Sequence, residues 1–355
     1  MNSNRFSLLV IAFVFCITAC QKQPESLMII PVETDQDSPV KLSEITKGEI
    51  KKISLELTDQ STIGRIAQVL YHSDGRLIVL DNSREPKIMV FDSNGKFIRR
   101  ISSKGAGPGE FSRIKDIALD SNANILYIVT AEEKILCYNL DGVLLNEVRL
   151  NSPISIFSQD KYLNVFASRM DRNSEKDYFI SQVLMFRVDK KFNVIDSLII
   201  KPECNVEGFF LPDPKVILSH VAKQTFFSYP DASPGMLLRD TLFELTAQKT
   251  IPVLKLRFSD EGANNAFMLM NLWRSKRFVF AQYFKRGIFY FVHDLKINKS
   301  SNMKGGLEDD VHHTGKVAIA PLLDNTYYYF ATPDLNNEKL KEEPNPNIYI
   351  GEFIE

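Results

Sequence analysis

Two similar segments, offset by 47 to 48 residues, constrain the fold of this chain more than any other feature. Residues 66–98 hold short runs rich in Ile, Val, Leu, Phe and Tyr that are separated by turn pairs, and residues 114–145 repeat the arrangement. The turn pairs are Asp74-Gly75, Asn94-Gly95 and Asp141-Gly142. Asp-Gly and Asn-Gly between apolar runs are typical of antiparallel strands joined by tight hairpins. A unit of four such strands with this period is typical of a β-propeller blade.

Weaker versions of the unit continue to the end of the chain. Their apolar segments are residues 161–167, 182–189 and 194–200, then 215–228, 241–245 and 253–258, then 277–283 and 287–294, and finally 317–321, 327–331 and 348–354. A blade exposes two apolar faces, and only stacking around a closed ring buries both of them. We therefore predict an all-β, six-bladed β-propeller of four-stranded antiparallel blades over residues 49–355. An early strand within residues 50–57 is expected to complete the last blade and close the ring.

Residues 263–274 are the expected exception to the strands. Their large apolar side chains cover much of a helical wheel without leaving a clean polar face. We predict a short connector helix there, packed on the outer edge or face of the ring.

Composition and charge agree with a folded chain and exclude several classes. A chain of 355 residues with 44% hydrophobic and 25% charged residues is not a collagen, a coiled coil or a wholly disordered protein. The 43 basic and 44 acidic residues leave a net charge of -1. Because this charge gives no overall positive field, we predict no nucleic-acid partner.

The first twenty residues carry an export signal. Arg5 precedes an apolar run at residues 6–17, which is shorter than the roughly 20 residues that a membrane-spanning helix needs. Ile17-Thr18-Ala19-Cys20 follows and resembles the bacterial lipobox, in which the Cys is acylated and the chain is cleaved before it. We predict a signal peptide over residues 1–19 and a lipid anchor on Cys20, because several acyl chains hold a protein to a membrane firmly. The alternative is an ordinary secretory signal that ends in a Cys by chance.

Residues 20–48 form the lead-in to the predicted propeller. Residues 21–26 are polar and are interpreted as a tether, whereas residues 27–32 either continue the lead-in or form an edge strand. The tether lacks both the Asp that retains some lipoproteins in the inner membrane and a dense acidic run of the kind linked to surface export. We therefore predict an outer-membrane anchor with the domain facing the periplasm.

The repeat region also carries a family resemblance. Residues 50–111 include Ile63-Gly64, the Asp-Gly blade turns and Gly105-Ala-Gly-Pro-Gly-Glu-Phe111, and they resemble NHL-type repeats. The chain is most similar to the six-bladed β-propeller lipoproteins of Bacteroidota, strongly over residues 50–150 and in a graded way beyond. This resemblance implies a lipid-anchored, monomeric propeller. Because some NHL-like propellers carry out metal-assisted lyase chemistry, it also leaves an enzyme open.

Residues just before an inner strand are expected to surround one mouth of the central channel. The offset of 48 residues aligns Arg65 with Arg113. The other cationic or imidazole side chains that precede inferred inner strands are Arg274, Arg277, His312, His313 and Lys316. Together they predict a cationic mouth that binds a carboxylated or sulfated ligand through forked guanidinium hydrogen bonds. The alternative is that they are solvated loop charges with nearby acidic partners.

Three further patterns favour structure over chemistry. The glycine-rich turn at residues 105–111 lacks the Gly-Lys-Ser/Thr ending of a P-loop, and Pro108 removes a donor, so an inter-blade turn is favoured over an anion cradle. Adjacent residues of a strand point to opposite faces, so His312 and His313 do not easily hold one metal unless they lie on a loop, and ligands from separate blades also stay open. Cys137 and Cys204 are either separate core residues or a disulfide, which the periplasm permits.

Two function classes remain after these observations. The favoured one is a binding or scaffolding module that captures a peptide, a glycan or a partner protein at the channel mouth, without a cofactor. It is favoured because the chain lacks a Gly-x-Ser-x-Gly or His-Glu-x-x-His pattern. The alternative is a metal-assisted lyase or hydrolase whose site is assembled from several blades and therefore leaves no local pattern.

Overall fold

The computed structural model describes residues 27–101, 104–159, 161–173, 178–206, 216–229, 240–259, 267–333 and 343–355. Cys20 and the predicted signal peptide and tether lie outside the described residues. Within the part of the chain that is described, no helix has the length and the apolar composition needed to cross a membrane.

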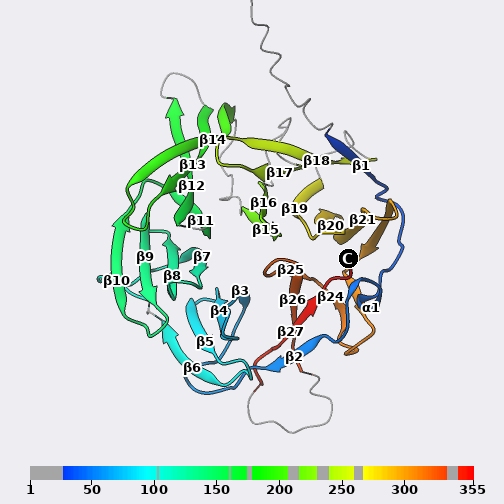
Figure 1. Ribbon diagram of the computed structural model, residues 1–355, viewed down its shortest axis with the longest axis horizontal. Coiled ribbons are helices and arrows are strands. Elements are labelled where there is room, and N and C mark those ends of the chain that lie inside the picture. The colour runs from blue at the N-terminus through cyan, green and yellow to red at the C-terminus, as the bar shows by residue number, and fades with distance from the viewer. Residues whose placement is uncertain are drawn as a thin grey trace, which may run out of the picture.

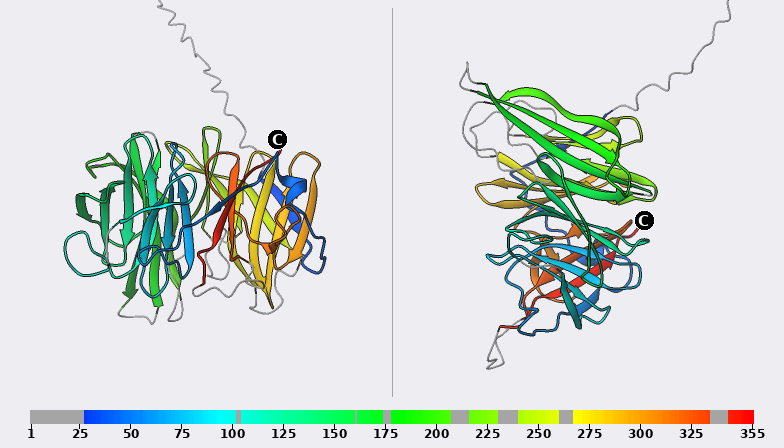
Figure 2. Two further views of the ribbon diagram at one scale, coloured as in Figure 1. Left: turned by 90° about the horizontal axis from the view of Figure 1, so that it is seen from below. Right: turned by 90° about the vertical axis from the view of Figure 1, so that its left-hand side faces the viewer.

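Six four-stranded antiparallel sheets surround a central axis as the blades of a propeller (Figure 1, Figure 2). Blade 1 consists of β3 (Ile66–Tyr71), β4 (Leu77–Asp81), β5 (Lys87–Phe91) and β6 (Phe97–Ile101). Blade 2 consists of β7 (Ile114–Asp120), β8 (Ile125–Thr130), β9 (Lys134–Asn139) and β10 (Leu144–Arg149). Blade 3 consists of β11 (Pro153–Gln159), β12 (Tyr162–Asn173), β13 (Tyr178–Val188) and β14 (Val194–Val206).

The second half of the ring follows the same plan. Blade 4 consists of β15 (Ile217–Val221), β16 (Gln224–Ser228), β17 (Thr241–Leu245) and β18 (Thr250–Phe258). Blade 5 consists of β19 (Phe267–Arg274), β20 (Phe278–Lys285), β21 (Ile288–Asp294) and β22 (Lys299–Lys304). Blade 6 consists of β25 (Ala320–Pro321), β26 (Thr326–Ala331), β27 (Asn347–Glu352) and β2 (Lys51–Ser54). The predicted six-bladed architecture is confirmed.

The N-terminal part of the described chain closes the ring. β2 pairs antiparallel with β27, so the early strand expected to complete the last blade is present. β1 (Met28–Val32) pairs parallel with β18 and adds a fifth strand to blade 4, which confirms the edge-strand alternative. Between them, α1 (Leu42–Ile45) and its neighbours cross blade 5, where Ser38 N–H donates to the Asn302 carbonyl at 2.7 Å. Residues 28–54, which we call the strap, therefore connect three blades along the rim (Figure 1).

Six apolar clusters hold the blades together, one at each seam between neighbours. β4 shows how the sequence produces them. Leu77 and Val79 face the cluster shared with blade 6, whereas Ile78 and Leu80 face the cluster shared with blade 2. Because side chains alternate across a strand and each blade is covered on both sides, a middle strand of this kind is a continuous apolar run.

The predicted helix at residues 263–274 is wrong over its described part, since residues 267–274 form β19, the inner strand of blade 5. Leu269 and Leu272 pack in the seam with blade 4, and Trp273 packs in the seam with blade 6. A strand that is apolar on both faces has no period of two, so its pattern resembles that of a buried helix.

Candidate functional site

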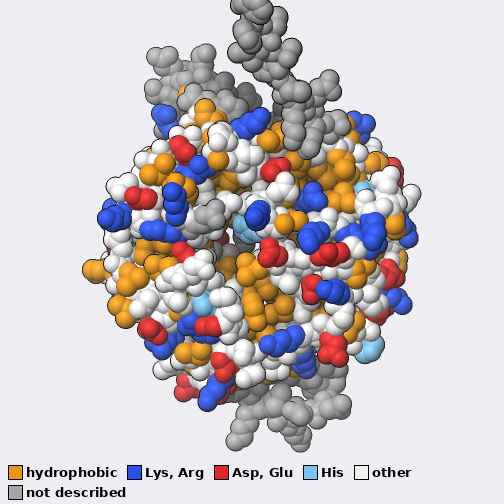
Figure 3. All heavy atoms as spheres, viewed as in Figure 1, with side chains coloured by type: hydrophobic (Ala, Val, Ile, Leu, Met, Phe, Trp, Pro, Cys, Tyr) orange, Lys and Arg blue, Asp and Glu red, His pale blue; other side chains and the backbone are white. Residues whose placement is uncertain are grey.

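A cavity of about 390 Å³ lies at the centre of the ring, and all six inner strands contribute to its wall. In the space-filling view this centre is hollowed, with apolar side chains beside the opening (Figure 3). Ligand sites in proteins are commonly concave, mainly apolar pockets of this size with a few placed polar groups. The cavity is therefore the candidate functional site.

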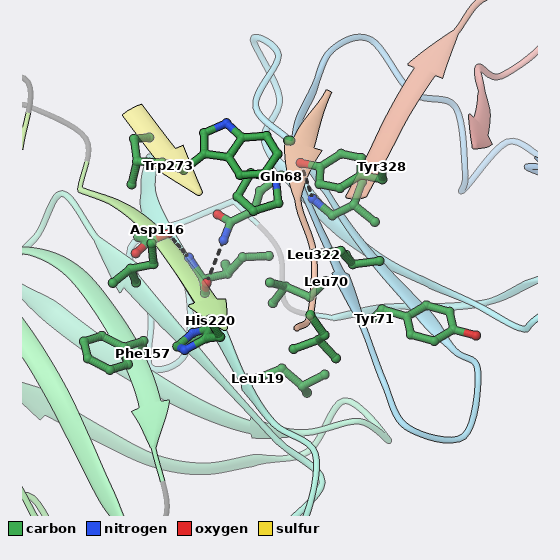
Figure 4. A pocket seen from close by; sticks show the side chains of 18 of the residues that line it. Gln68, Leu70, Tyr71, Asp116, Leu119, Phe157, His220, Trp273, Leu322 and Tyr328 are labelled. Atoms are coloured by element: carbon green, nitrogen blue, oxygen red, sulfur yellow. Dashed lines mark hydrogen bonds between the residues drawn. The ribbon is translucent and has the colours of Figure 1, made fainter. Parts of the chain in front are cut away.

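The wall of the cavity is mostly apolar. Leu70, Leu119 and Leu322 approach from three different blades, and their side chains point into a common space (Figure 4). Trp273, the only Trp of the chain, borders the cavity and stacks on Phe280 with ring centroids 4.3 Å apart. Among the described residues that line the cavity there is no Lys or Arg, and Asp116 is the single carboxylate.

An irregularity of the β-bulge kind interrupts the pairing of the inner strand in four of the blades, and a polar residue follows it in each. The residue that follows the irregularity is Gln68 in β3, Asp116 in β7, Ser155 in β11 and Asn271 in β19. A bulge inserts one extra residue and turns the local side chains, which is why bulges often occur beside functional sites. Gln68, Asp116 and Asn271 all line the cavity.

Two of these polar side chains join one blade to the next. Gln68 Nε2 donates to the carbonyl oxygen of Ile117 at 3.0 Å. The Asp116 carboxylate accepts from the backbone N–H of Ile156 at 3.1 Å and from the hydroxyl of Ser155. These bonds connect blade 1 to blade 2 and blade 2 to blade 3, so a buried carboxylate in the wall has the hydrogen bonds that it requires.

The remaining polar wall groups are neutral. Asn271 Nδ2 donates to Gln282 Oε1 at 2.9 Å, and Gln282 Nε2 donates to the Tyr290 hydroxyl at 2.7 Å. His220 Nδ1 lies 3.1 Å from Thr225 Oγ1, and its burial lowers the pKa of the imidazole, with Asp324 opposing this effect. Because the ordinary His pKa is already near 6.5, His220 is uncharged at neutral pH.

The aligned arginines lie where inner strands begin. Arg65 and Arg113 directly precede β3 and β7, and their carbonyls accept equivalent bonds, from Asn82 N–H and Ala131 N–H, both at 3.0 Å. The predicted alignment of these two positions therefore holds in space. Both side chains are exposed, and neither guanidinium bonds to any residue that the structure describes.

Arg274 and Arg277 lie at the other end of the inner strands. Arg274 is the last residue of β19, and Arg277 lies in the turn to β20. The Arg274 guanidinium lies over the Phe226 ring, 4.9 Å from its centroid, and Arg277 forms an ion pair with Asp294 at 2.7 Å. They therefore occupy the opposite face of the ring from the two aligned arginines.

His312, His313 and Lys316 belong to a hairpin between blades 5 and 6, formed by β23 (Leu307–Asp309) and β24 (Gly315–Val317). His312 Nε2 lies 2.9 Å from the Ile50 carbonyl oxygen, and Lys316 Nζ donates to the Lys304 carbonyl at 2.6 Å. His313 is exposed, and none of the three lines the cavity. The seven predicted residues are thus divided among three places, and anion binding by the pair at the inner-strand starts stays a prediction.

The glycine-rich turn binds the chain's own carboxylates. Gly107 N–H donates to Glu110 Oε2 at 2.7 Å, and Gly109 N–H donates to Glu147 Oε2 at 2.8 Å. The predicted inter-blade turn is therefore confirmed, because donors that would form an anion cradle are already used. Cys137 is a buried free thiol, and burial raises its pKa to about 12. The side chain of Cys204 lies outside the described part of the structure. Within the described ranges no three His, Cys, Asp or Glu residues are grouped so as to hold a metal ion.

Comparison with known proteins places the chain in a family. A family described as "Domain of unknown function (DUF4934)" matches residues 27–352. The chain belongs to the DUF4934 family. The comparison with curated proteins finds no match for this DUF4934 chain.

Among solved structures, the DUF4934 chain is similar to a "Putative exported protein" from Bacteroides fragilis NCTC 9343, with a TM-score of 0.67 and 17% identity over 92% of this chain and 99% of the other. That likeness supports the fold. It is also similar to the β-propeller domain of Myceliophteria thermophila Cps50 (Swd1), with a TM-score of 0.45 and 11% identity over 83% of this chain and 98% of the other. The second likeness is too weak to support an inference.

The sequence of this DUF4934 chain contains one pattern that indicates the cavity wall and that the alignment of the arginines does not use. Gln68 and Asp116 are also 48 residues apart, and each is a polar residue inside an apolar inner strand. A polar residue that can hydrogen-bond across a seam, at the same place in two repeats, indicates a shared structural position. The aligned arginines, three residues earlier, predict a site at the mouth of the channel and not in its wall.

Proposed function

We propose that this DUF4934 chain is a lipid-anchored, monomeric propeller of the cell envelope that binds an uncharged, mainly apolar ligand in its central cavity. The ligand is either a small molecule or an apolar group carried by a peptide, a glycan or a partner protein. The observation that carries this proposal is the wall of the cavity, which combines leucines and aromatic rings with neutral amide groups. Such a wall favours apolar surface through its removal from water.

The cell-envelope part of the proposal is supported by the lipobox-like residues 17–20 and by the resemblance to NHL-like lipoproteins. The similar Bacteroides fragilis structure carries the name of an exported protein, which agrees with this address. We propose an outer-membrane anchor with the propeller facing the periplasm.

Substitution of Cys20 by Ala is expected to abolish lipid attachment and the cleavage before residue 20, so that the chain keeps its apolar run at residues 6–17. Cys20 is the only residue of the lipobox-like sequence that can form the thioether. Intact-protein mass spectrometry measures both effects. Thr18→Ser, which keeps a small residue at a neighbouring position, is the control and is expected to be cleaved and acylated. A native chain without the mass of the acyl chains contradicts the anchor.

Ligand binding is tested with N-phenyl-1-naphthylamine, an uncharged apolar dye that accepts excitation energy from tryptophan. Because the only Trp of the chain borders the cavity, dye bound there is expected to quench Trp273 emission and to gain emission itself. We expect a saturable titration with one dye per chain. A titration without saturable energy transfer would falsify the binding proposal.

A further inference from the structure

Gln68 occupies a defined place in the cavity wall. It follows the irregularity between Ile66 and Gln68 in β3, and its side chain lies in the middle of the cavity wall (Figure 4). Its Nε2 donates to the carbonyl oxygen of Ile117 in blade 2 at 3.0 Å. This bond fixes the direction of the carboxamide, because a backbone carbonyl accepts hydrogen bonds and never donates them.

The fixed direction leaves the carboxamide oxygen available to a ligand as an acceptor, beside the second hydrogen of Nε2. With Nε2 used by Ile117, Gln68 presents Oε1, to which no described residue donates. Asn271 repeats this arrangement in blade 5, where Nδ2 is used by Gln282 and no described residue donates to Oδ1. Both amides therefore offer acceptor oxygens to a ligand in the cavity that they line.

We propose that the cavity selects uncharged ligands that carry a hydrogen-bond donor, a hydroxyl or an N–H group, on an apolar body, and that Gln68 Oε1 accepts this donor. The proposal rests on the proposed function, since it names the ligand class of the same cavity. A ligand without a donor would cover an amide oxygen and leave it unpaired, and sites built in this way reject analogues that lack the matching group.

Three uncharged probes of similar size separate the donor from the rest of the ligand. They are 2-naphthol, 2-methoxynaphthalene and 2-methylnaphthalene, and each is measured by displacement of bound N-phenyl-1-naphthylamine. We expect 2-naphthol to bind about three- to tenfold more tightly than the other two, which is the factor given by one net hydrogen bond. Equal affinity of 2-naphthol and 2-methoxynaphthalene overturns the donor requirement even when the dye itself binds.

Gln68→Met and Gln68→Ala then assign the acceptor. Each removes Oε1, and each folded variant is expected to bind 2-naphthol and 2-methylnaphthalene with nearly equal affinity. Gln224→Met changes an exposed Gln on β16 outside the cavity and is expected to keep the preference. Thermal unfolding shows which variants are folded. A preference that survives in a folded Gln68 variant overturns the assignment, whereas failure of the dye to bind the native chain removes the proposed function as well.

Discussion

Replacement of Ile53 by Asp is expected to lower the free energy of unfolding by more than about 4 kcal/mol. Ile53 lies in β2, the strand that the N-terminal region contributes to blade 6, and only 2% of it is exposed. Its side chain packs in the seam between blades 6 and 1. An Asp at this position places an unpaired carboxylate in the seam that closes the ring. Urea or thermal unfolding followed by circular dichroism measures the loss.

Lys52→Asp is the matched control for this substitution. Lys52 is the preceding residue of the same strand, and its side chain is exposed. An exposed strand position outside any packed contact usually changes stability by no more than about 0.5 kcal/mol. If Ile53→Asp and Lys52→Asp unfold at the same temperature as the native chain, closure of the ring by β2 is wrong.

Leu119→Arg is expected to weaken binding of N-phenyl-1-naphthylamine by at least about tenfold. Leu119 is a partly exposed residue of β7 that points into the cavity (Figure 4). An Arg there takes up part of the space and brings a charge into an apolar wall, which opposes entry of an uncharged ligand. Because a long cationic side chain can extend its head to water at the channel mouth, the fold is expected to tolerate the change. The dye titration with Trp273 as energy donor measures the effect.

Leu145→Arg serves as the comparison within the same blade. Leu145 belongs to the outer strand β10 and is 53% exposed, so the substitution adds the same charge far from the axis. We expect unchanged dye binding in this variant. Similar dye affinity in Leu119→Arg and Leu145→Arg would show that the dye binds outside the cavity.

Local turn chemistry made most of the fold predictable. The Asp-Gly and Asn-Gly pairs place the hairpins of blades 1 and 2. Side chains of β4 and β8 point alternately to the two faces of their blade, so each strand packs in the seams on both sides. The closing strand was predictable because a ring of blades requires one. The hairpins depend on residues close in sequence, and the closing strand follows from the closure of the ring. Both can be predicted from the sequence alone.

The inner strands β11 and β19 are harder to predict because they are apolar on both faces and no Asp-Gly or Asn-Gly pair follows them. The sequence pattern predicts no strand over β11, and it predicts a helix over β19. The second error also displaced the predicted mouth, since it made β20 the inner strand of blade 5 and placed Arg274 and Arg277 before it. The cavity is lined by residues from six strands that are far apart in sequence, so no local sequence pattern predicts it.

The strap also determines how the propeller responds to a pull on its N-terminus. β1 runs parallel to β18 over five residue pairs, from Met28 opposite Leu254 to Val32 opposite Phe258. Force applied at Met28 along the direction of β1 loads the bonds to β18 together in shear instead of breaking them one after another. The closing strand β2 lies beyond this pairing and is shielded from the tension. A propeller held by its N-terminus would therefore bear mechanical load on blade 4 while the seam that closes the ring stays unloaded.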